Sequence, residues 1–139
     1  YTIDQRQQIT ATAPVFDLVN TVGNPPSLRL VWNLSWSLRG WTVQSTLNYT
    51  GAYRDPGSVP VRKVDSWTTA DLNIGYRVDG GSGWLAHTQF NLGINNALDQ
   101  RPPFVNQFDL ASGTLGYDPA NASLLGRQVS LQVVKRWGQ

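Results

Sequence analysis

The chain has 139 residues and a net charge of +2, and 14% of its residues are charged, compared with about 25% in an average soluble domain. It lacks cysteine, methionine and glutamate and has one histidine, which excludes disulfide scaffolds, thiolate nucleophiles, multi-histidine metal sites and glutamate-dependent protease or calcium motifs. The basic residues are scattered and no apolar run reaches about 18 residues, so neither nucleic-acid binding nor a transmembrane helix is expected.

Apolar and polar residues alternate with a period of two along most of the chain, which is the pattern of half-buried β-strands. A less regular alternation predicts a strand within residues 3–12. Regular alternation predicts further strands over residues 28–39, 41–53, 69–78, 84–95 and 128–137. No segment shows the period of an amphipathic helix, so the expected fold class is all-β.

The connections between these strands are of two kinds. Arg39-Gly40 and the glycine-rich segment 79–83 predict tight hairpin turns, because glycine readily adopts a positive φ. The other connections, residues 13–27, 54–65 and 97–125, are long. Short and long connections alternate, so all short turns share one end of the sheet, as in antiparallel up-and-down transmembrane β-barrels. A soluble β-sandwich or propeller is the alternative, but its polar face would carry more charge.

Aromatic residues are expected near the short-turn end of the apolar face, since indole and phenol rings favour the membrane–water interface. This predicted girdle consists of Trp36, Trp41, Tyr76, Trp84 and Trp137. Trp84 is expected to begin a strand directly after a turn, and Trp137 to close the last strand. Tyr49, Tyr53 and Trp67 are candidates for the girdle at the opposite interface.

Five or six strands are too few to close a membrane barrel. Bacterial barrels begin at about eight strands, and an open sheet would leave unpaired edges in lipid. We therefore expect the chain to be part of a larger barrel, or to complete one with other chains. Because the chain begins with Tyr1 and not with methionine, a processed chain or a fragment is expected.

Four segments resemble the C-terminal barrel portion of TonB-dependent outer-membrane receptors. They are VDSWTTADL at residues 64–72, LGINNALD followed by RPPF at 92–104, GYDPANA with GR at 116–127, and VSLQVVKRW at 129–137. The end departs from the family, because Trp137 stands in place of the commoner phenylalanine and two residues follow it. The resemblance implies that residues 1–139 are the C-terminal segment of a barrel of about 22 strands, without the plug domain.

The function implied by the resemblance is that of an outer-membrane active-transport receptor, which takes up a nutrient such as a siderophore, cobalamin or a carbohydrate. The implied location is the bacterial outer membrane, and no enzyme activity or cofactor is expected. The implied partners are outer-membrane lipid, the rest of the barrel and plug, the inner-membrane TonB complex through the missing N-terminal part, the barrel-assembly machinery and a small nutrient ligand.

Two groups of residues are candidate functional sites. The last strand resembles the signal read by the barrel-assembly machinery, in which alternate side chains set the register of strand addition; its residues are Gly126, Val129, Leu131, Val133 and Trp137. The longest loop offers aromatic side chains to a ligand, and these are Phe104, Phe108 and Tyr117. The alternative is a loop that packs only on itself.

Two rival functions remain open from the sequence. An outer-membrane enzyme would use His87, which the alternation places on the water-facing side of a strand. Catalysis would need a nucleophile and an orienting group beside it, and no such motif occurs, so a histidine in the barrel wall is favoured. The second rival is a soluble β-sandwich that acts as a binding module.

Overall fold

The computed structural model describes residues 4, 6–8, 16–80, 83–106, 108–109 and 113–137. In this part of the chain the regular structure consists of β-strands, and no helix is long and apolar enough to cross a membrane. The residues form two compact units. The sheet unit comprises Val31–Asn48, Thr69–Gln100 and Leu125–Gln139. The loop unit comprises Tyr1–Leu30, Tyr49–Thr68 and Arg101–Leu124.

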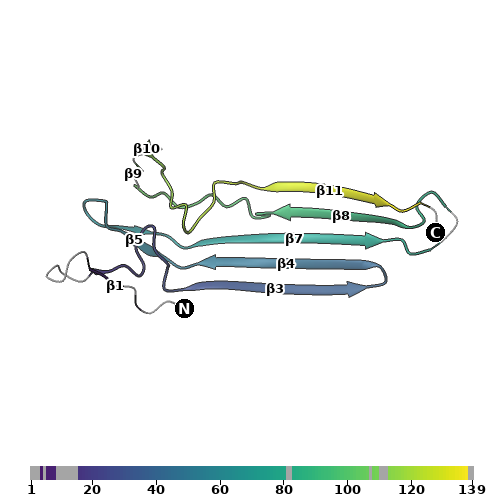
Figure 1. Ribbon diagram of the computed structural model, residues 1–139, viewed down its shortest axis with the longest axis horizontal. Helices are drawn as coiled ribbons and strands as arrows, with labels where there is room; N and C mark the ends of the chain where they lie inside the picture. Colours follow the sequence, from purple (N-terminus) through teal and green to yellow (C-terminus); the bar gives the residue numbers. More distant parts are fainter. Residues whose placement is uncertain are drawn as a thin grey trace. The chain divides into compact units, whose positions relative to one another are not determined.

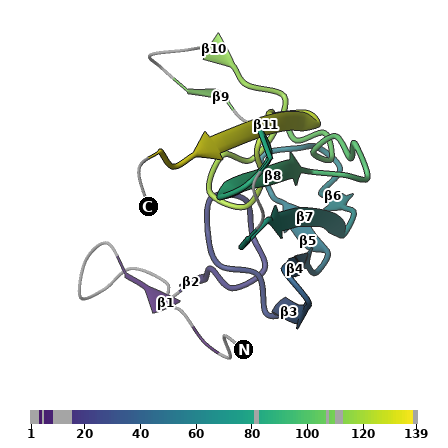
Figure 2. The same ribbon diagram turned by 90° about the vertical axis from the view of Figure 1, so that its right-hand side faces the viewer.

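A five-stranded antiparallel sheet is the main element of the fold (Figure 1). Its strands in spatial order are β11 (Gln128–Lys135), β8 (Thr88–Asn95), β7 (Trp67–Arg77), β4 (Trp41–Thr50) and β3 (Arg29–Leu38). The same order is seen when the strands are viewed nearly end-on (Figure 2). β3 and β11 are the two edge strands, and each pairs with one neighbour among the described strands. The predicted all-β antiparallel fold is confirmed.

The register of the sheet brings the alternating side chains onto common faces. Leu72 pairs with Ile94, and Ile74 pairs with Leu92. On the other side of β8, Leu131 pairs with Leu92. Side chains directly opposite each other in a ladder lie on the same face, so the apolar residues of three neighbouring strands form one surface. The polar residues between them form the other surface.

The apolar face of the sheet is exposed rather than packed in a core. Trp32 of β3 retains 58% of its accessible surface and Leu131 of β11 retains 70%. The buried hydrophobic cluster instead lies in the loop unit, where it consists of Tyr53, Val64 and Val105. A soluble sheet normally covers such a face with a second layer, and among the described residues of the sheet unit no second layer does so.

The two short connections differ in form. Arg39 and Gly40 have φ angles of 47° and 84°, so both central residues are left-handed, as a two-residue hairpin turn requires. The second connection is longer than predicted, because β7 ends at Arg77 and β8 begins at Thr88. His87 adopts a φ of 54° immediately before β8. The predicted strand start at residue 84 is therefore wrong, and the predicted tight turn at 79–83 includes residues 81–82, which lie outside the described residues.

The long connections contain short hairpins. β5 (Tyr53–Asp55) pairs with β6 (Arg62–Val64), and β9 (Phe108–Asp109) pairs with β10 (Gly113–Thr114). The predicted strand over 41–53 is therefore divided: β4 ends at Thr50, and Tyr53 belongs to β5. Much of the predicted strand over 3–12 lies outside the described residues. The part that is described contains β1 (Arg6–Gln7), which pairs with β2 (Phe16–Asp17).

Candidate functional site

A buried carboxylate, that of Asp118, holds the loop unit together. It is fully buried and accepts hydrogen bonds from the backbone N–H of Gly23 at 3.0 Å, the side-chain amide of Asn121 at 2.7 Å and the backbone N–H of Ala120 at 3.0 Å. The contact with Gly23 joins segments 95 residues apart. These three N–H donors satisfy the hydrogen-bonding capacity of the buried carboxylate. The GYDPANA segment therefore acts as a clasp between two loops.

Asn121 extends this clasp to a third point. Its side-chain amide donates to the backbone carbonyl of Asn24 at 2.9 Å, and its carbonyl oxygen accepts a hydrogen bond from the guanidinium of Arg29 at 3.1 Å. Arg29 is the first residue of β3. The clasp thus holds the segment that leads into β3. The side chain of Asn121 bonds three groups, namely the carboxylate of Asp118, the carbonyl of Asn24 and the guanidinium of Arg29.

A second buried carboxylate, that of Asp55, joins two other loops. It accepts hydrogen bonds from Gly57 N at 3.1 Å, from Ser58 Oγ at 2.8 Å and from Asn106 N at 3.1 Å. The first two contacts close the turn after β5, and the third reaches the loop that follows β8. Both long loops are therefore held by buried aspartates.

Tyr53 lies in the core of the loop unit and not at an interface. Its hydroxyl is buried and has no hydrogen-bond partner among the described residues, and the same is true of the indole N–H of Trp67. Burial raises the pKa of the Tyr53 hydroxyl above its usual range, and the nearby negative charge of Asp118 raises it further. The prediction that Tyr53 belongs to an aromatic girdle is therefore wrong, since its ring is 3% exposed.

An open cavity of about 490 Å³ lies between β6 and the loop after β8. Its lining residues include Arg62, Lys63 and Phe104. The guanidinium carbon of Arg62 lies 5.4 Å from the ring centroid of Phe104, within the range of a cation–π contact. Phe104 and Asp65 are exposed, so the cavity presents two cations, one carboxylate and an aromatic ring to solvent.

The structure separates the three aromatic residues predicted to face a ligand. Phe104 lines the cavity described above, whereas Tyr117 is half-buried and does not line it. The side chain of Phe108 lies outside the described residues. The sequence reasoning missed Arg62 and Lys63 as part of this cavity, although they are an adjacent pair of basic residues.

The predicted aromatic girdle is only partly on strands. Trp36, Trp41 and Tyr76 lie on β3, β4 and β7, and the rings of Trp41 and Tyr76 have centroids 4.5 Å apart. Trp84 lies in the turn before β8, and Trp137 follows the end of β11. The predictions that Trp84 begins a strand and that Trp137 closes one are therefore wrong. Both indoles are nonetheless more than four-fifths exposed, at 84% and 83%.

Lys135 connects the segments that carry these two tryptophans. Its ammonium donates hydrogen bonds to the backbone carbonyls of Trp84, at 2.9 Å, and Ala86. The same ammonium lies 5.1 Å from the ring centroid of Trp137. The end of β11 is thus tied to the turn before β8, and both tryptophans lie at that end of the sheet.

The last strand carries its predicted side chains on an open edge. Val129, Leu131 and Val133 of β11 lie on the apolar face and are exposed. Gly126 was expected at the start of this strand. It instead precedes the strand, which begins at Gln128. A ladder of backbone groups at a free edge can accept a further strand.

His87 is not part of the sheet wall, contrary to the sequence prediction. It lies in the connection before β8, where its backbone carbonyl accepts a hydrogen bond from Arg136 N at 3.1 Å. Among the described residues, no group of three or more histidine and aspartate side chains is placed to hold a metal ion.

A comparison with family models matches residues 1–97 to the TonB dependent receptor-like β-barrel family. The chain belongs to this family. Searches of curated proteins and of solved structures gave no match. TonB-dependent receptors are transport proteins of the bacterial outer membrane, and their barrels are larger than this five-stranded sheet. The exposed apolar face and the two free edges are the surfaces expected of a section of such a barrel.

Proposed function

We propose that this chain forms the C-terminal section of the barrel wall in an outer-membrane receptor for TonB-dependent nutrient uptake. The exposed apolar face of the sheet carries this proposal, because in water it would be an aggregation surface and in lipid it is the required one. Family membership supports transport and not catalysis as the activity.

The polar face suits a water-filled barrel interior. Its side chains form hydrogen bonds with one another across strands, as from Thr46 Oγ1 to Asn33 Oδ1 at 2.8 Å and from Asn91 Nδ2 to Gln132 Oε1 at 3.3 Å. Glycines alternate with these side chains, and a Cβ at Gly93 would lie 2.8 Å from Ser130 Oγ. Most of these groups are small and uncharged, with Asp71 and Arg77 as charged exceptions, and such a surface suits contact with water, a plug or a passing ligand.

The free edges of β3 and β11 support completion of the barrel by other strands. Unpaired backbone groups cannot remain exposed in the bilayer, since each would lose several kcal/mol of hydrogen bonding. The exposed side chains Val129, Leu131 and Val133 then serve the barrel-assembly machinery by setting the register of the last strand.

Ligand contact is assigned to the loop cavity. The cations Arg62 and Lys63 outnumber the one carboxylate of the cavity, that of Asp65. Together with the ring of Phe104 they favour a ligand with a negative charge beside a flat or apolar part. A ferric siderophore fits this description better than a neutral carbohydrate does. Cobalamin is the third candidate ligand to be tested.

Cysteine accessibility tests the assignment of the two faces. The chain has no cysteine, so single substitutions can be labelled without interference from it. Asn91→Cys and Leu92→Cys are neighbours on β8 that lie on opposite faces. In intact outer membranes, a water-soluble maleimide should label Asn91→Cys and should not label Leu92→Cys until the protein is denatured. Equal labelling of both variants before denaturation would contradict the lipid-facing assignment.

Uptake assays test the loop cavity. Phe104→Ala and Arg62→Gln should each weaken binding of the transported ligand in a panel of ferric siderophores, cobalamin and oligosaccharides. Leu124→Ala is the matched control, because Leu124 is an exposed apolar residue of the same long loop and does not line the cavity. Unchanged affinity in both cavity variants would remove this cavity from the proposal.

A further inference from the structure

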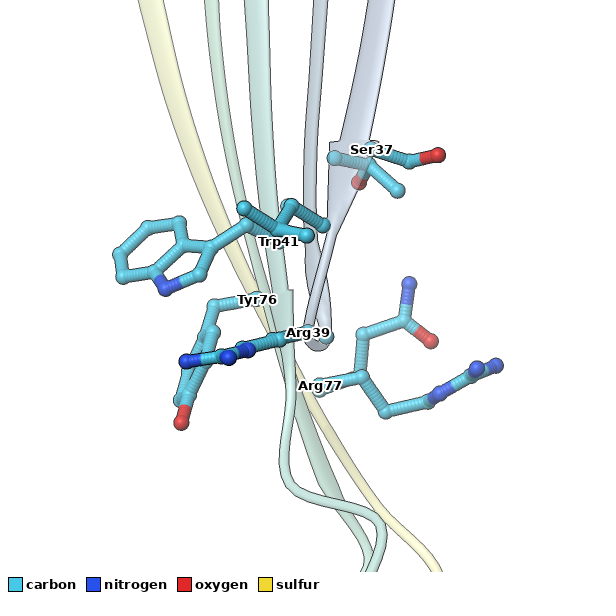
Figure 3. A pocket seen from close by; sticks show the side chains of 10 residues that line it. Ser37, Arg39, Trp41, Tyr76 and Arg77 are labelled. Carbon is cyan, nitrogen blue, oxygen red and sulfur yellow. The ribbon is translucent and has the colours of Figure 1, made fainter.

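The turn between β3 and β4 places a cation beside an aromatic pair. Figure 3 shows the side chain of Arg39 on the same side of the ribbon as the rings of Trp41 and Tyr76. Trp41 and Tyr76 belong to the apolar face of the sheet. The cavity at this turn has a volume of about 420 Å³. It is lined by these three residues and also by residues of the polar face, among them Ser37, Arg77 and Gln89.

The second arginine at this turn is arranged differently. Figure 3 shows Arg77 on the other side of the ribbon, with Ser37. The guanidinium of Arg77 forms an ion pair with Asp79 at 2.5 Å. Arg39 forms no ion pair with any described residue, so its charge has no protein partner there. The cation without a partner is therefore the one on the apolar side.

An apolar groove of about 290 Å³ begins at the same aromatic pair. Its lining residues are Trp41, Ile74, Tyr76, Phe90, Leu92 and Leu131, which come from four neighbouring strands. This volume is close to the lower limit of small-ligand pockets, about 300 Å³. Trp41 and Tyr76 line both the groove and the cavity that holds Arg39.

We propose that Arg39 and this groove bind one anionic glycerophospholipid of the periplasmic leaflet. The phosphate pairs with Arg39, and one acyl chain lies in the groove. The proposal rests on the proposed function, which places the apolar face in lipid and the short turns at the periplasmic side.

The chemistry of each part selects this ligand. The guanidinium requires an anion and has five N–H donors, which suit a phosphate group. The groove requires an apolar chain, and an acyl chain is the apolar group that a bilayer supplies in excess. The aromatic pair lies between these two environments, at the depth where headgroup and chain meet. A soluble phosphate would occupy only the cavity at the turn and would leave the groove unfilled.

Native mass spectrometry of the complete protein, purified from outer membranes in detergent, tests the proposal. Phosphatidylglycerol is the anionic probe, phosphatidylcholine is the zwitterionic probe, and glycerol 3-phosphate is the soluble probe. We expect the protein to retain phosphatidylglycerol in preference to phosphatidylcholine, and glycerol 3-phosphate not to displace it. Arg39→Gln should lower the affinity for phosphatidylglycerol about fivefold, as for loss of one membrane-facing cation. Arg39→Lys should keep most of it.

Two controls separate this site from general effects of charge. Arg127→Gln removes an ion-paired cation of the same sheet unit that lines neither the cavity nor the groove, and it should leave lipid retention unchanged. Leu131→Trp fills the groove without changing charge and should weaken retention of both lipids. Equal losses in Arg39→Gln and Arg127→Gln would overturn the proposal, as would displacement by glycerol 3-phosphate or the absence of any preference in the unaltered protein. A protein that is missing from the outer-membrane fraction would instead contradict the proposed function.

Discussion

The indole of Trp41 and the phenol ring of Tyr76 lie with their centroids 4.5 Å apart and their planes inclined by 37°. The two residues come from neighbouring strands that are separated in the sequence by a long loop. The contact therefore depends on the pairing of β4 with β7 and not on the local sequence. It also marks the short-turn end of the apolar face, where Arg39 lies on the same side of the ribbon as the two rings (Figure 3).

Replacing both rings should reveal coupling between them. Trp41→Leu and Tyr76→Leu are each expected to destabilise the sheet, and the double variant should lose less than the sum. The expected coupling free energy is about 1 kcal/mol, as for other aromatic pairs. It can be measured from urea unfolding of the complete protein in lipid bilayers. Trp36→Leu combined with Tyr76→Leu is the control, and the losses of stability in these two variants should be additive. A coupling free energy as large as that of the Trp41–Tyr76 pair would show that the ring contact has no special role.

Gly40→Ala should weaken the first hairpin strongly. Gly40 has a φ of 84°, and a Cβ there would lie 2.6 Å from the backbone oxygen of Arg77. The left-handed conformation alone costs about 1–2 kcal/mol for a residue with a side chain, and the clash with backbone adds to it. The heat-modifiable gel mobility of the folded barrel should be lost at a lower temperature. Gly80→Ala, where a Cβ meets nothing within 4 Å, should leave that temperature unchanged.

Asp118→Asn should loosen the loops while preserving the size of the side chain. Three N–H donors face the two carboxylate oxygens. In asparagine an NH2 group replaces one of these oxygens, and this group cannot accept a hydrogen bond. A loss of about 1–3 kcal/mol in local stability is expected. Hydrogen exchange at Gly23 and Ala120 should accelerate. Asp65→Asn, at an exposed position, is the control, and equal protection in Asp118→Asn and the unaltered protein would refute the role of the clasp.

Tyr53→Phe should change the response of the loop unit to alkaline pH. Burial raises the pKa of this hydroxyl in the folded protein, and Asp118 raises it further, whereas an unfolded tyrosine ionises near pH 10. The unfolded state therefore releases a proton above about pH 10 while the folded state retains it, and stability falls as the pH rises.

The Tyr53→Phe variant has no such proton and should lose less stability above about pH 10 than the unaltered protein. Near neutral pH it should be at least as stable, because the hydroxyl is buried without a partner. Tyr117→Phe is the control at a half-buried position. Proteolysis of the loops as a function of pH measures the effect, and identical alkaline profiles for Tyr53→Phe and the unaltered protein would contradict it.

Trp137→Ala should lower the amount of receptor in the outer membrane if the end of β11 is read during assembly. Trp84→Ala is a closely matched control, because its indole is equally exposed at the same end of the sheet and does not belong to the last strand. Membrane fractionation with immunoblotting measures both variants. Equal reductions in the two variants would point to general anchoring at the interface and not to an assembly signal.

Local chemistry explains which strands the sequence predicted well. The structure places four strands close to their expected positions, namely β3, β4, β7 and β11. The alternation of apolar and polar residues with a period of two shows where each strand runs and which side chains share a face. The start of β8 was misplaced, because residues 84–87 continue the same alternation in a turn. His87 has a left-handed φ and separates this turn from β8. The polarity of a residue does not reveal such a backbone conformation.

The loop unit shows the opposite case. The GYDPANA segment was recognised by its resemblance to a family, but its role as a clasp depends on Gly23, which lies 95 residues away in the sequence. Likewise, Tyr53 continued the alternation of β4 and was predicted to face an interface, whereas its ring is buried against Val64 and Val105. A tyrosine suits both a membrane interface and a buried protein core, so polarity alone does not distinguish these two environments.

The sequence by itself determined that this protein is an antiparallel sheet with one apolar and one polar face, because side-chain alternation follows directly from strand geometry. It also indicated that the sheet belongs to a larger barrel, because strand number is limited by length. Only the tertiary structure decided which loop residues are buried, which arginine at the first turn has no ion-pair partner and where the groove lies. These features depend on contacts between residues far apart in the chain, and alternation carries no information about them.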